Sequence, residues 1–149
     1  MQFIEKTFNQ LSAIELYHLL KLRVDVFVVE QNCAYQELDG LDLDNQTSHL
    51  IGYDGDDIVA YARVLAPGIC YSNSAAIGRV IIANSHRGKG FAKELVNKAI
   101  ELSQHHWPVQ GIEISAQCYL IEFYQSLGFN TEGQEYLEDD IPHIHMILG

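Results

Sequence analysis

The feature that most constrains this chain is a strand followed closely by two glycines and an amphipathic helix. Val80-Ile81-Ile82 ends an apolar run, Arg87-Gly88-Lys89-Gly90 follows, and apolar residues then repeat at helical spacing from position 91 to position 102. A helix N-terminus carries free amide N–H groups and a partial positive charge, so it binds phosphate where side chains leave the approach open. The pattern therefore predicts an anion-binding site at the start of this helix.

The distribution of charge supports this prediction. The 149 residues include 9 Lys+Arg and 20 Asp+Glu, a formal net charge of −11, yet Arg79, Arg87, Lys89 and Lys93 all lie near the glycines. The acidic remainder, concentrated at positions 37–57 and 132–140, argues against nucleic acid or an anionic membrane as a partner, because both require a cationic surface. An acidic surface favours a cationic acceptor molecule.

Two familiar phosphate-binding loops do not match these glycines. The mononucleotide loop requires Ser or Thr after Gly-Lys, but Gly90 follows Lys89 here. The dinucleotide fingerprint requires a third glycine at the position of Lys93. A nucleotide-binding switch is therefore a secondary hypothesis.

The hydrophobic pattern predicts one domain, residues 1–149, of the α/β class with a mixed α+β sheet. We expect strands at 3–4, 49–53, 58–65, 76–83, 112–117 and 142–148, and helices at 11–29, from 91 to near 108, and at 120–127. Ser12 and Glu15 suit a capping box at the first helix. Residues 30–45 form an acidic loop, either solvated or a rim for a cationic substrate. A splay of the central strands near a β-bulge would open a cleft.

The cysteines and the N-terminal residues indicate a reducing environment. Cys33, Cys70 and Cys118 are odd in number and widely spaced, with no plausible disulfide framework. The first residues show no basic region followed by an apolar run, so we expect no signal peptide and a cytoplasmic protein. Domains of this size often pair through sheet edges or helices, which leaves a homodimer as a further hypothesis.

Two blocks of sequence resemble one family. Arg87-Gly88-Lys89-Gly90-Phe91-Ala92 resembles the Arg/Gln-x-x-Gly-x-Gly/Ala loop of the GCN5-related N-acetyltransferase (GNAT) superfamily, and Phe123-Tyr124-Gln125-Ser126-Leu127-Gly128-Phe129 resembles its Phe-Tyr-x-x-x-Gly-Phe segment. Segments 22–33, 61–64, 77–80, 106–108 and 140–144 are further similar to the ElaA-like subgroup. The resemblance implies a GNAT-type acyl-CoA N-acyltransferase fold. It also implies transfer of acetyl from acetyl-CoA, as co-substrate and without a metal, to an amine on a small molecule or peptide.

The resemblance also implies roles for individual residues. Amides of residues 88–93 would cradle the pyrophosphate, and main-chain groups of residues 80–82 would hold the pantetheine arm and polarise the thioester carbonyl. The implied cofactor-binding residues are Val80, Ile81, Ile82, Arg87, Gly88, Lys89, Gly90, Phe91, Ala92, Lys93 and Gln117. Tyr124 would be the general acid, because a phenol with a pKa near 10 stays protonated at neutral pH and can donate to the departing thiolate.

The general base stays open between four residues. An amine with a pKa near 10 arrives as ammonium and must lose a proton before it attacks. No carboxylate lies between positions 75 and 84, so the candidates are Glu30, Glu113, His49 and His143. Arg63 and Arg79 could instead bind a carboxylate on the acceptor.

Other interpretations of the pattern carry less weight. His143 and His145 with Asp139 or Asp140 offer too few ligands at metal spacing to favour zinc. Cys118 is better interpreted as a small packing residue than as a nucleophile. The main rival to an enzyme is a non-catalytic acyl-CoA-binding module or sensor, which would keep the phosphate cradle without a competent base.

Overall fold

The computed structural model describes residues 1–149 and contains one seven-stranded sheet in the order β1-β2-β3-β4-β5-β7-β6. The strands are β1 (Gln2–Lys6), β2 (Ser48–Asp54), β3 (Asp57–Leu65), β4 (Ser74–Ile82), β5 (Gly111–Gln117), β6 (Asn130–Glu138) and β7 (Ile141–Leu148). The helices are α1 (Ala13–Val24), α2 (Phe91–His106) and α3 (Ile121–Ser126). Only β4 and β5 pair in parallel, and every other pairing is antiparallel. The prediction of a mixed sheet is confirmed.

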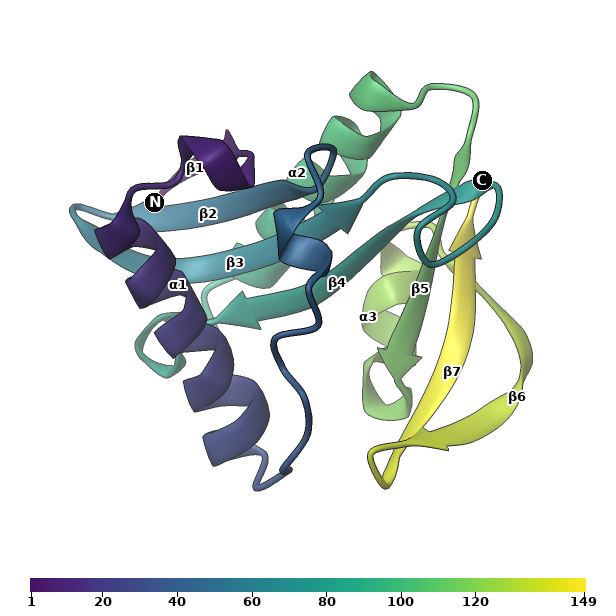
Figure 1. Ribbon diagram of the computed structural model, residues 1–149. Coiled ribbons are helices and arrows are strands. Elements are labelled where there is room, and N and C mark those ends of the chain that lie inside the picture. Colours follow the sequence, from purple (N-terminus) through teal and green to yellow (C-terminus); the bar gives the residue numbers. More distant parts are fainter.

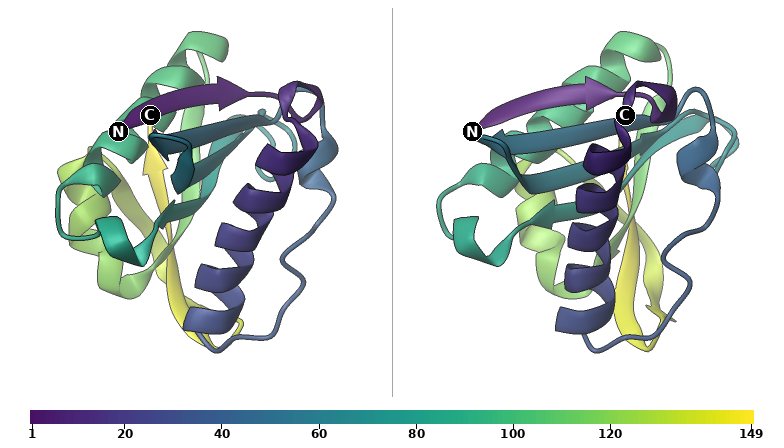
Figure 2. Two further views of the ribbon diagram at one scale, coloured as in Figure 1. Left: turned by 90° about the vertical axis from the view of Figure 1, so that its left-hand side faces the viewer. Right: turned by 60° about the vertical axis from the view of Figure 1, so that its left-hand side comes forward.

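Helices lie on both faces of the sheet. Figure 1 shows α1 in front of β2, β3 and β4, and Figure 2 shows α2 and α3 on the opposite side. The larger core joins α2 and α3 to the sheet through residues such as Leu95, Ile114 and Phe129, and the smaller core joins α1 to Tyr61 and Ile81. On the α1 side, no helix covers β5, β7 and β6 (Figure 1). That uncovered half of the sheet is free to face a ligand.

The first helix begins as predicted but ends earlier. The Ser12 side chain accepts a hydrogen bond from the Glu15 N–H, and the Glu15 carboxylate accepts one from the Ser12 N–H, which confirms the capping box. The α-helix ends at Val24 and continues as a π-helical turn over Asp25–Glu30, so the prediction of one regular helix to residue 29 is wrong. β-branched valines crowd this stretch, and a wider turn relieves that crowding.

The last hairpin contains a strand that the sequence pattern did not predict. Every residue of β6 is exposed, so the strand has no alternation of apolar and polar residues to reveal it. Its pairing with β7 is interrupted between Glu132 and Tyr136, where Gly133 has φ +80°. An exposed edge strand with such a bulge has little sequence signature.

None of the three helices combines the length and the apolarity that crossing a bilayer would require. The predicted hairpin between β2 and β3 is confirmed, and residues 3 and 4 do belong to the edge strand β1.

Candidate active site

A cavity of about 870 Å³ lies between β4 and β5, of the size that suits a cofactor or small substrate. Its walls come from β4, β5, the start of α2, α3, the turn after α1, and the β6–β7 hairpin. Every implied cofactor-binding residue except Lys89 lines it, and so does the implied general acid Tyr124. The fold thus brings two distant blocks of sequence to one hollow.

The cavity exists because β4 and β5 diverge. They pair only at Ser74↔Gly111, Ala75↔Ile112 and Ala76↔Glu113, and beyond Ala76 this edge of β4 has no strand partner. On the other edge, the register of β4 with β3 shifts at a bulge where Arg79 adopts φ +54°. A bulge bends a strand and increases its twist, so the predicted splay near a bulge is confirmed. The free main-chain edge of β4 is suited to pairing with an extended ligand.

The N-terminus of α2 opens into the same cavity. Gly90 is the residue before its first turn, has φ +81°, and leaves the helix without any side-chain cap. Gly88 has φ +77°, and a Cβ at either glycine would meet no atom within 4 Å. Both backbone conformations favour glycine, and the free amides of the first turn face open space. This geometry fits a phosphate group.

The basic residues near the glycines differ in their partners and in whether they line the cavity. The Arg87 Nε donates to the Ile82 carbonyl at 2.9 Å, and its Nη1 lies 2.8 Å from the Glu30 carboxylate. Lys93 lines the cavity, whereas Lys89 does not. The Arg79 guanidinium turns to the acidic loop instead, with Nε 2.8 Å from Glu37. The prediction that Arg79 adds charge to the phosphate cradle is therefore wrong, since a carboxylate already neutralises it.

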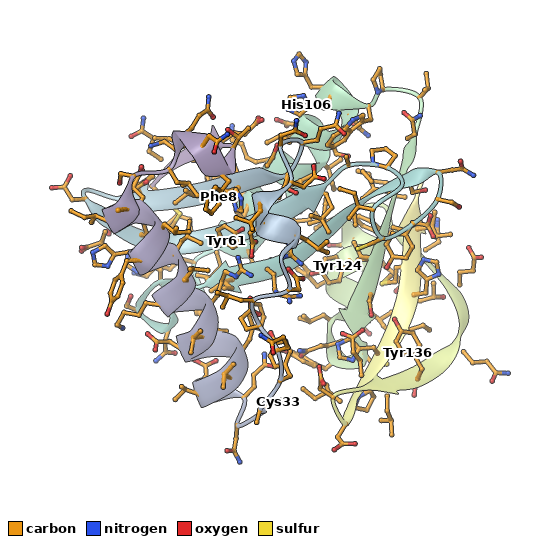
Figure 3. The ribbon with its side chains drawn as sticks, in the orientation of Figure 1. Phe8, Cys33, Tyr61, His106, Tyr124 and Tyr136 are labelled. Carbon is orange, nitrogen blue, oxygen red and sulfur yellow. The ribbon has the colours of Figure 1, made fainter.

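Tyr124 lies on α3 with its ring held between two aromatic neighbours. Phe123 and Phe129 contact it edge-on at centroid distances of 5.1 and 5.8 Å. Its side chain is 8% exposed and lines the cavity where β4 and β5 diverge (Figure 3), and its hydroxyl makes no hydrogen bond within the protein. Burial, with a smaller contribution from Tyr119, raises the pKa of Tyr124 to about 12. The phenol therefore carries a proton at neutral pH.

The four candidate bases lie in different environments. His49 is fully buried, with Nδ1 2.6 Å from the Tyr61 hydroxyl and Nε2 3.2 Å from the Asp42 carbonyl, and it does not line the cavity. Burial lowers the pKa of His49, so it is a neutral core residue and the expectation that it could act as a base is wrong. Glu30 lines the cavity but is paired with Arg87. Glu113 and His143 both line the cavity on the uncovered half of the sheet.

One cluster on this uncovered half surrounds Glu113. The His145 Nε2 lies 2.7 Å from the Glu113 Oε1, and Tyr71 stacks on the imidazole at a centroid distance of 5.3 Å and an interplanar angle of 15°. Glu113, Ser115 and Gln117 alternate with the buried residues of β5 and point to this side. That alternation was visible in the sequence and could have marked β5 as the floor of a site.

A second cluster of the same composition surrounds His143. Its Nδ1 lies 2.7 Å from the Ile141 carbonyl and its Nε2 lies 3.4 Å from Glu138, while Tyr136 stacks on the ring. The Tyr136 hydroxyl also hydrogen-bonds Ser115. Sequence reasoning missed Tyr136 and Glu138 because both lie on β6, the strand that it did not predict.

Two acids of the predicted acidic loop are not solvated, although Glu30 and Tyr35 of the same segment line the cavity. Glu37 is 3% exposed and Asp42 is 6% exposed, and both lie against the fully buried Arg23, at 2.6 and 2.7 Å. Burial alone would raise the pKa of Asp42, but hydrogen bonding and charge from Arg23 and Arg63 outweigh it and hold that pKa below its ordinary value. These acids therefore neutralise buried arginines and do not face a substrate.

The same network occupies the arginines that were candidates for binding an acceptor carboxylate. Arg63 forms two hydrogen bonds with Asp39, at 2.8 and 2.9 Å, and another with Asp42. Arg79 pairs with Glu37 and Asp39. Both arginines line the cavity and the Arg63 Nε has no hydrogen-bond partner, but an acceptor carboxylate that bound either guanidinium would compete with these existing ion pairs.

The structure holds no cluster of metal-binding geometry: no three His, Cys, Asp or Glu side chains come together as a ligand set, His143 and His145 included. All three cysteines are free thiols; Cys33 and Cys118 are half-buried and Cys70 is exposed.

Together these features define an acyl-CoA N-acyltransferase fold: a splayed parallel pair of strands, a phosphate-accepting helix N-terminus and a buried tyrosine. A family model described as "Acetyltransferase (GNAT) domain" matches residues 16–149. Protein ElaA of Escherichia coli (strain K12) is 45% identical over 138 residues, which cover 93% of this chain and 90% of that protein.

Solved structures agree. The crystal structure of Escherichia coli ElaA matches with a TM-score of 0.93 and 42% identity and covers 100% of both chains. That of an acyl-CoA N-acyltransferase from Pseudomonas aeruginosa matches with a TM-score of 0.94 and 40% identity, over 99% of each chain. The chain therefore belongs to the GNAT acetyltransferase family and, within it, to the ElaA-like subgroup, and this membership supports an acyl-CoA N-acyltransferase activity.

Proposed function

We propose that the protein transfers an acetyl group from acetyl-CoA to a primary amine, by direct attack in a ternary complex. The observation that carries this proposal is that one cavity contains the uncapped N-terminus of α2, the unpaired edge of β4 and the Tyr124 hydroxyl. A donor with a phosphorylated end, an extended arm and a reactive thioester matches these three features in order. The similar Pseudomonas aeruginosa protein is described as an acyl-CoA N-acyltransferase, which supports the same donor class.

Different groups of the protein would bind the donor, polarise its thioester and protonate the leaving thiolate. Amides of Gly88 to Lys93 bind the pyrophosphate, and the free edge of β4 from Val80 to Ile82 pairs with the pantetheine amides. A main-chain N–H at the bulge of β4 polarises the thioester carbonyl. The amine attacks that carbon, the C–N bond forms, and the C–S bond breaks as Tyr124 donates its proton to sulfur.

The raised pKa of Tyr124 is compatible with this donation. An ordinary thiol has a pKa near 8.5, so a phenol at about 12 is a weaker acid than a thiol in water. The departing thiolate forms in the same buried place, however, and desolvation raises the proton affinity of both anions. The transfer is thus less unfavourable than the two values in water imply.

The experiment is the variant Tyr124→Phe, measured with a free-thiol readout on a panel of benzylamine, spermidine and a tripeptide with a free N-terminus. Turnover should fall by roughly 10²–10⁴-fold, the usual contribution of a general acid, while acetyl-CoA affinity survives. Tyr17→Phe, at an exposed position on α1, is the matched control and should change nothing.

The outcomes separate the rival functions. Unchanged turnover in Tyr124→Phe would contradict the assigned role of that residue. A wild-type protein that binds acetyl-CoA but acetylates none of the amines would favour the acyl-CoA-binding module or sensor. A thermal shift with ATP or GTP but not with acetyl-CoA would favour the nucleotide-binding switch.

A further inference from the structure

We propose that Glu113, supported from behind by His145, receives the ammonium group of the acceptor and takes its proton. This assignment rests on the proposed function and adds to it the acceptor-side residue and the chemical class of the acceptor, an amine that arrives as a cation. It also replaces the carboxylate that β4 lacks between positions 75 and 84.

The position of Glu113 in the sheet is the first observation. It is the last residue of β5 that pairs with β4, opposite Ala76, so its side chain lies at the point where the two strands begin to separate. It lines the cavity together with Gly78 and Tyr124. Strand residues rise about 3.3 Å each, so Glu113 is within two or three residue steps of the β4 bulge, where the thioester is expected. An amine between them would contact both.

The second observation is how Glu113 is held. Its Oε1 lies 2.7 Å from the His145 Nε2, a close contact without hydrogen-bond geometry, and Tyr71 stacks on that imidazole. His145 itself does not line the cavity, whereas Glu113 does. One carboxylate oxygen therefore lies beside an imidazole that is outside the cavity lining, and a carboxylate has further acceptor sites for an ammonium ion in the cavity.

The groups around Glu113 include no competing cation with a free charge. His145 approaches from β7, Tyr71 and Cys70 from the β3–β4 connection, and Tyr136 and Glu138 from β6. Arg63 and Arg79, which lie beyond Cys70, are already paired with Asp39 and Glu37. Burial, followed by the neighbouring anionic groups, raises the pKa of Tyr71 to about 12, so this phenol stays neutral. An incoming ammonium group would be the counter-ion of Glu113.

The other cavity-lining candidates are engaged in ways that suit them less. Glu30 is paired with Arg87 beside the phosphate-binding helix, away from the acceptor side. Both ring nitrogens of His143 face oxygen atoms of the protein, Ile141 and Glu138.

The proton balance is complete with these residues. A proton moves from the ammonium nitrogen to the Glu113 carboxylate, and the neutral amine attacks the thioester carbon. As the intermediate collapses, Tyr124 donates its proton to the leaving sulfur, and the second proton of the nitrogen passes to the resulting phenolate and restores the phenol. The products are an N-acetyl amine, CoA thiol and one proton, which leaves Glu113 to solvent.

The test is Glu113→Gln, assayed from pH 6 to pH 10 with two kinds of nucleophile. With spermidine or benzylamine as the acceptor, kcat/KM at neutral pH should fall by roughly 10²–10⁴-fold. The defect should shrink as the pH approaches about 10, because the acceptor then loses its proton to solvent. With hydroxylamine, whose nitrogen is unprotonated at neutral pH, the variant and the wild type should react at similar rates.

Two further variants distinguish catalysis from structure. Glu113→Asp keeps a carboxylate and should restore part of the activity, and Glu122→Gln, at an exposed position on α3, should behave as the wild type. Acetyl-CoA affinity and Tm should stay unchanged in Glu113→Gln. A defect in that variant that is equal at every pH and for both nucleophiles would overturn the proposal, as would wild-type rates.

The role of Glu113 and the proposed function fail in different ways. A wild-type enzyme that acetylates the amines while Glu113→Gln does the same at every pH overturns only the role of Glu113. A wild-type protein that acetylates neither the amines nor hydroxylamine overturns the proposed function and the base together.

Discussion

The sheet face that carries α1 has a covered half and an uncovered half. The two halves place similar types of side chain in different surroundings. Over β2, β3 and β4, Tyr61, His49 and Asp42 lie under α1 or its loop and contact only other parts of the protein. Over β5 and β7, Tyr71, His145 and Glu113 form a similar set beside an open cavity.

The two halves differ in whether α1 and its loop cover them, and not in the types of side chain that they contain. Beside α1, Glu37, Asp39 and Asp42 each pair with a buried arginine, and the pKa values of Asp39 and Asp42 stay low because these guanidinium groups outweigh the effect of burial. On the uncovered half no arginine is present to match Glu113 or Glu138, whose nearest ionisable partners are histidines. A carboxylate that the fold leaves without a permanent cation is the one available to a cationic substrate.

The largest effect on stability is expected from removing Arg23, the buried cation at the centre of the covered half. Arg23→Ala would leave Glu37 and Asp42 short of a buried cation, and such a loss costs about 3–5 kcal/mol of folding free energy. Urea unfolding would measure it. Lys21→Ala on the same helix removes an exposed pair with Asp25 and should cost about 0.5 kcal/mol or less. Equal losses in the two variants would mean that the buried network does not hold α1 and its loop in place.

A smaller effect should follow from acidifying the wild-type protein. Asp39 and Asp42 have depressed pKa values in the folded state, so their contribution to stability is fully present above their ordinary value of 3.8. It is lost as the pH falls through the lower folded-state values, because the unfolded chain then binds more protons. The free energy of unfolding, measured in urea between pH 5 and pH 2, should therefore fall toward acid. Arg23→Ala should show a shallower fall, and an identical slope would contradict the assignment.

The smallest effect on stability should come from removing the N-terminal cap of α1, the helix that covers this half. Ser12→Ala removes the cap of α1 and should cost about 1 kcal/mol, whereas Ser12→Asp should retain the cap. Acetyl transfer should not change in either variant, because α1 covers the half of the sheet that does not face the acceptor. A change in kcat/KM would show that the two halves are coupled.

Prediction from sequence succeeded where local structure depends on contiguous residues. The glycine-opened helix and the segment around Tyr124 each place their groups within a few positions, and local geometry orients them in the same way in any protein that contains them. The strand pattern likewise predicted a central position for β4, since it is apolar on both faces apart from Gly78 and Arg79. Only β6 and the π-helical turn after α1 escaped this reasoning.

Prediction failed where charged residues meet across long sequence separations. The acids at positions 37–42 resemble a solvated loop in one dimension, and their partners Arg23, Arg63 and Arg79 are 14 to 42 positions away. Similarly, Glu113 and His143 could not be distinguished as bases, because their neighbours come from β6, β7 and the β3–β4 connection.

The sequence by itself determined the class of fold, the glycine-opened helix and the short helix that carries Tyr124, because hydrophobic periodicity and main-chain geometry are local properties. The tertiary structure alone decided which charged side chains form ion pairs within the protein and which are left without a permanent counter-ion beside the cavity. Coulombic pairing and desolvation depend on distance and cover in three dimensions, and in this chain the placement of α1 separates the matched acids from the available ones.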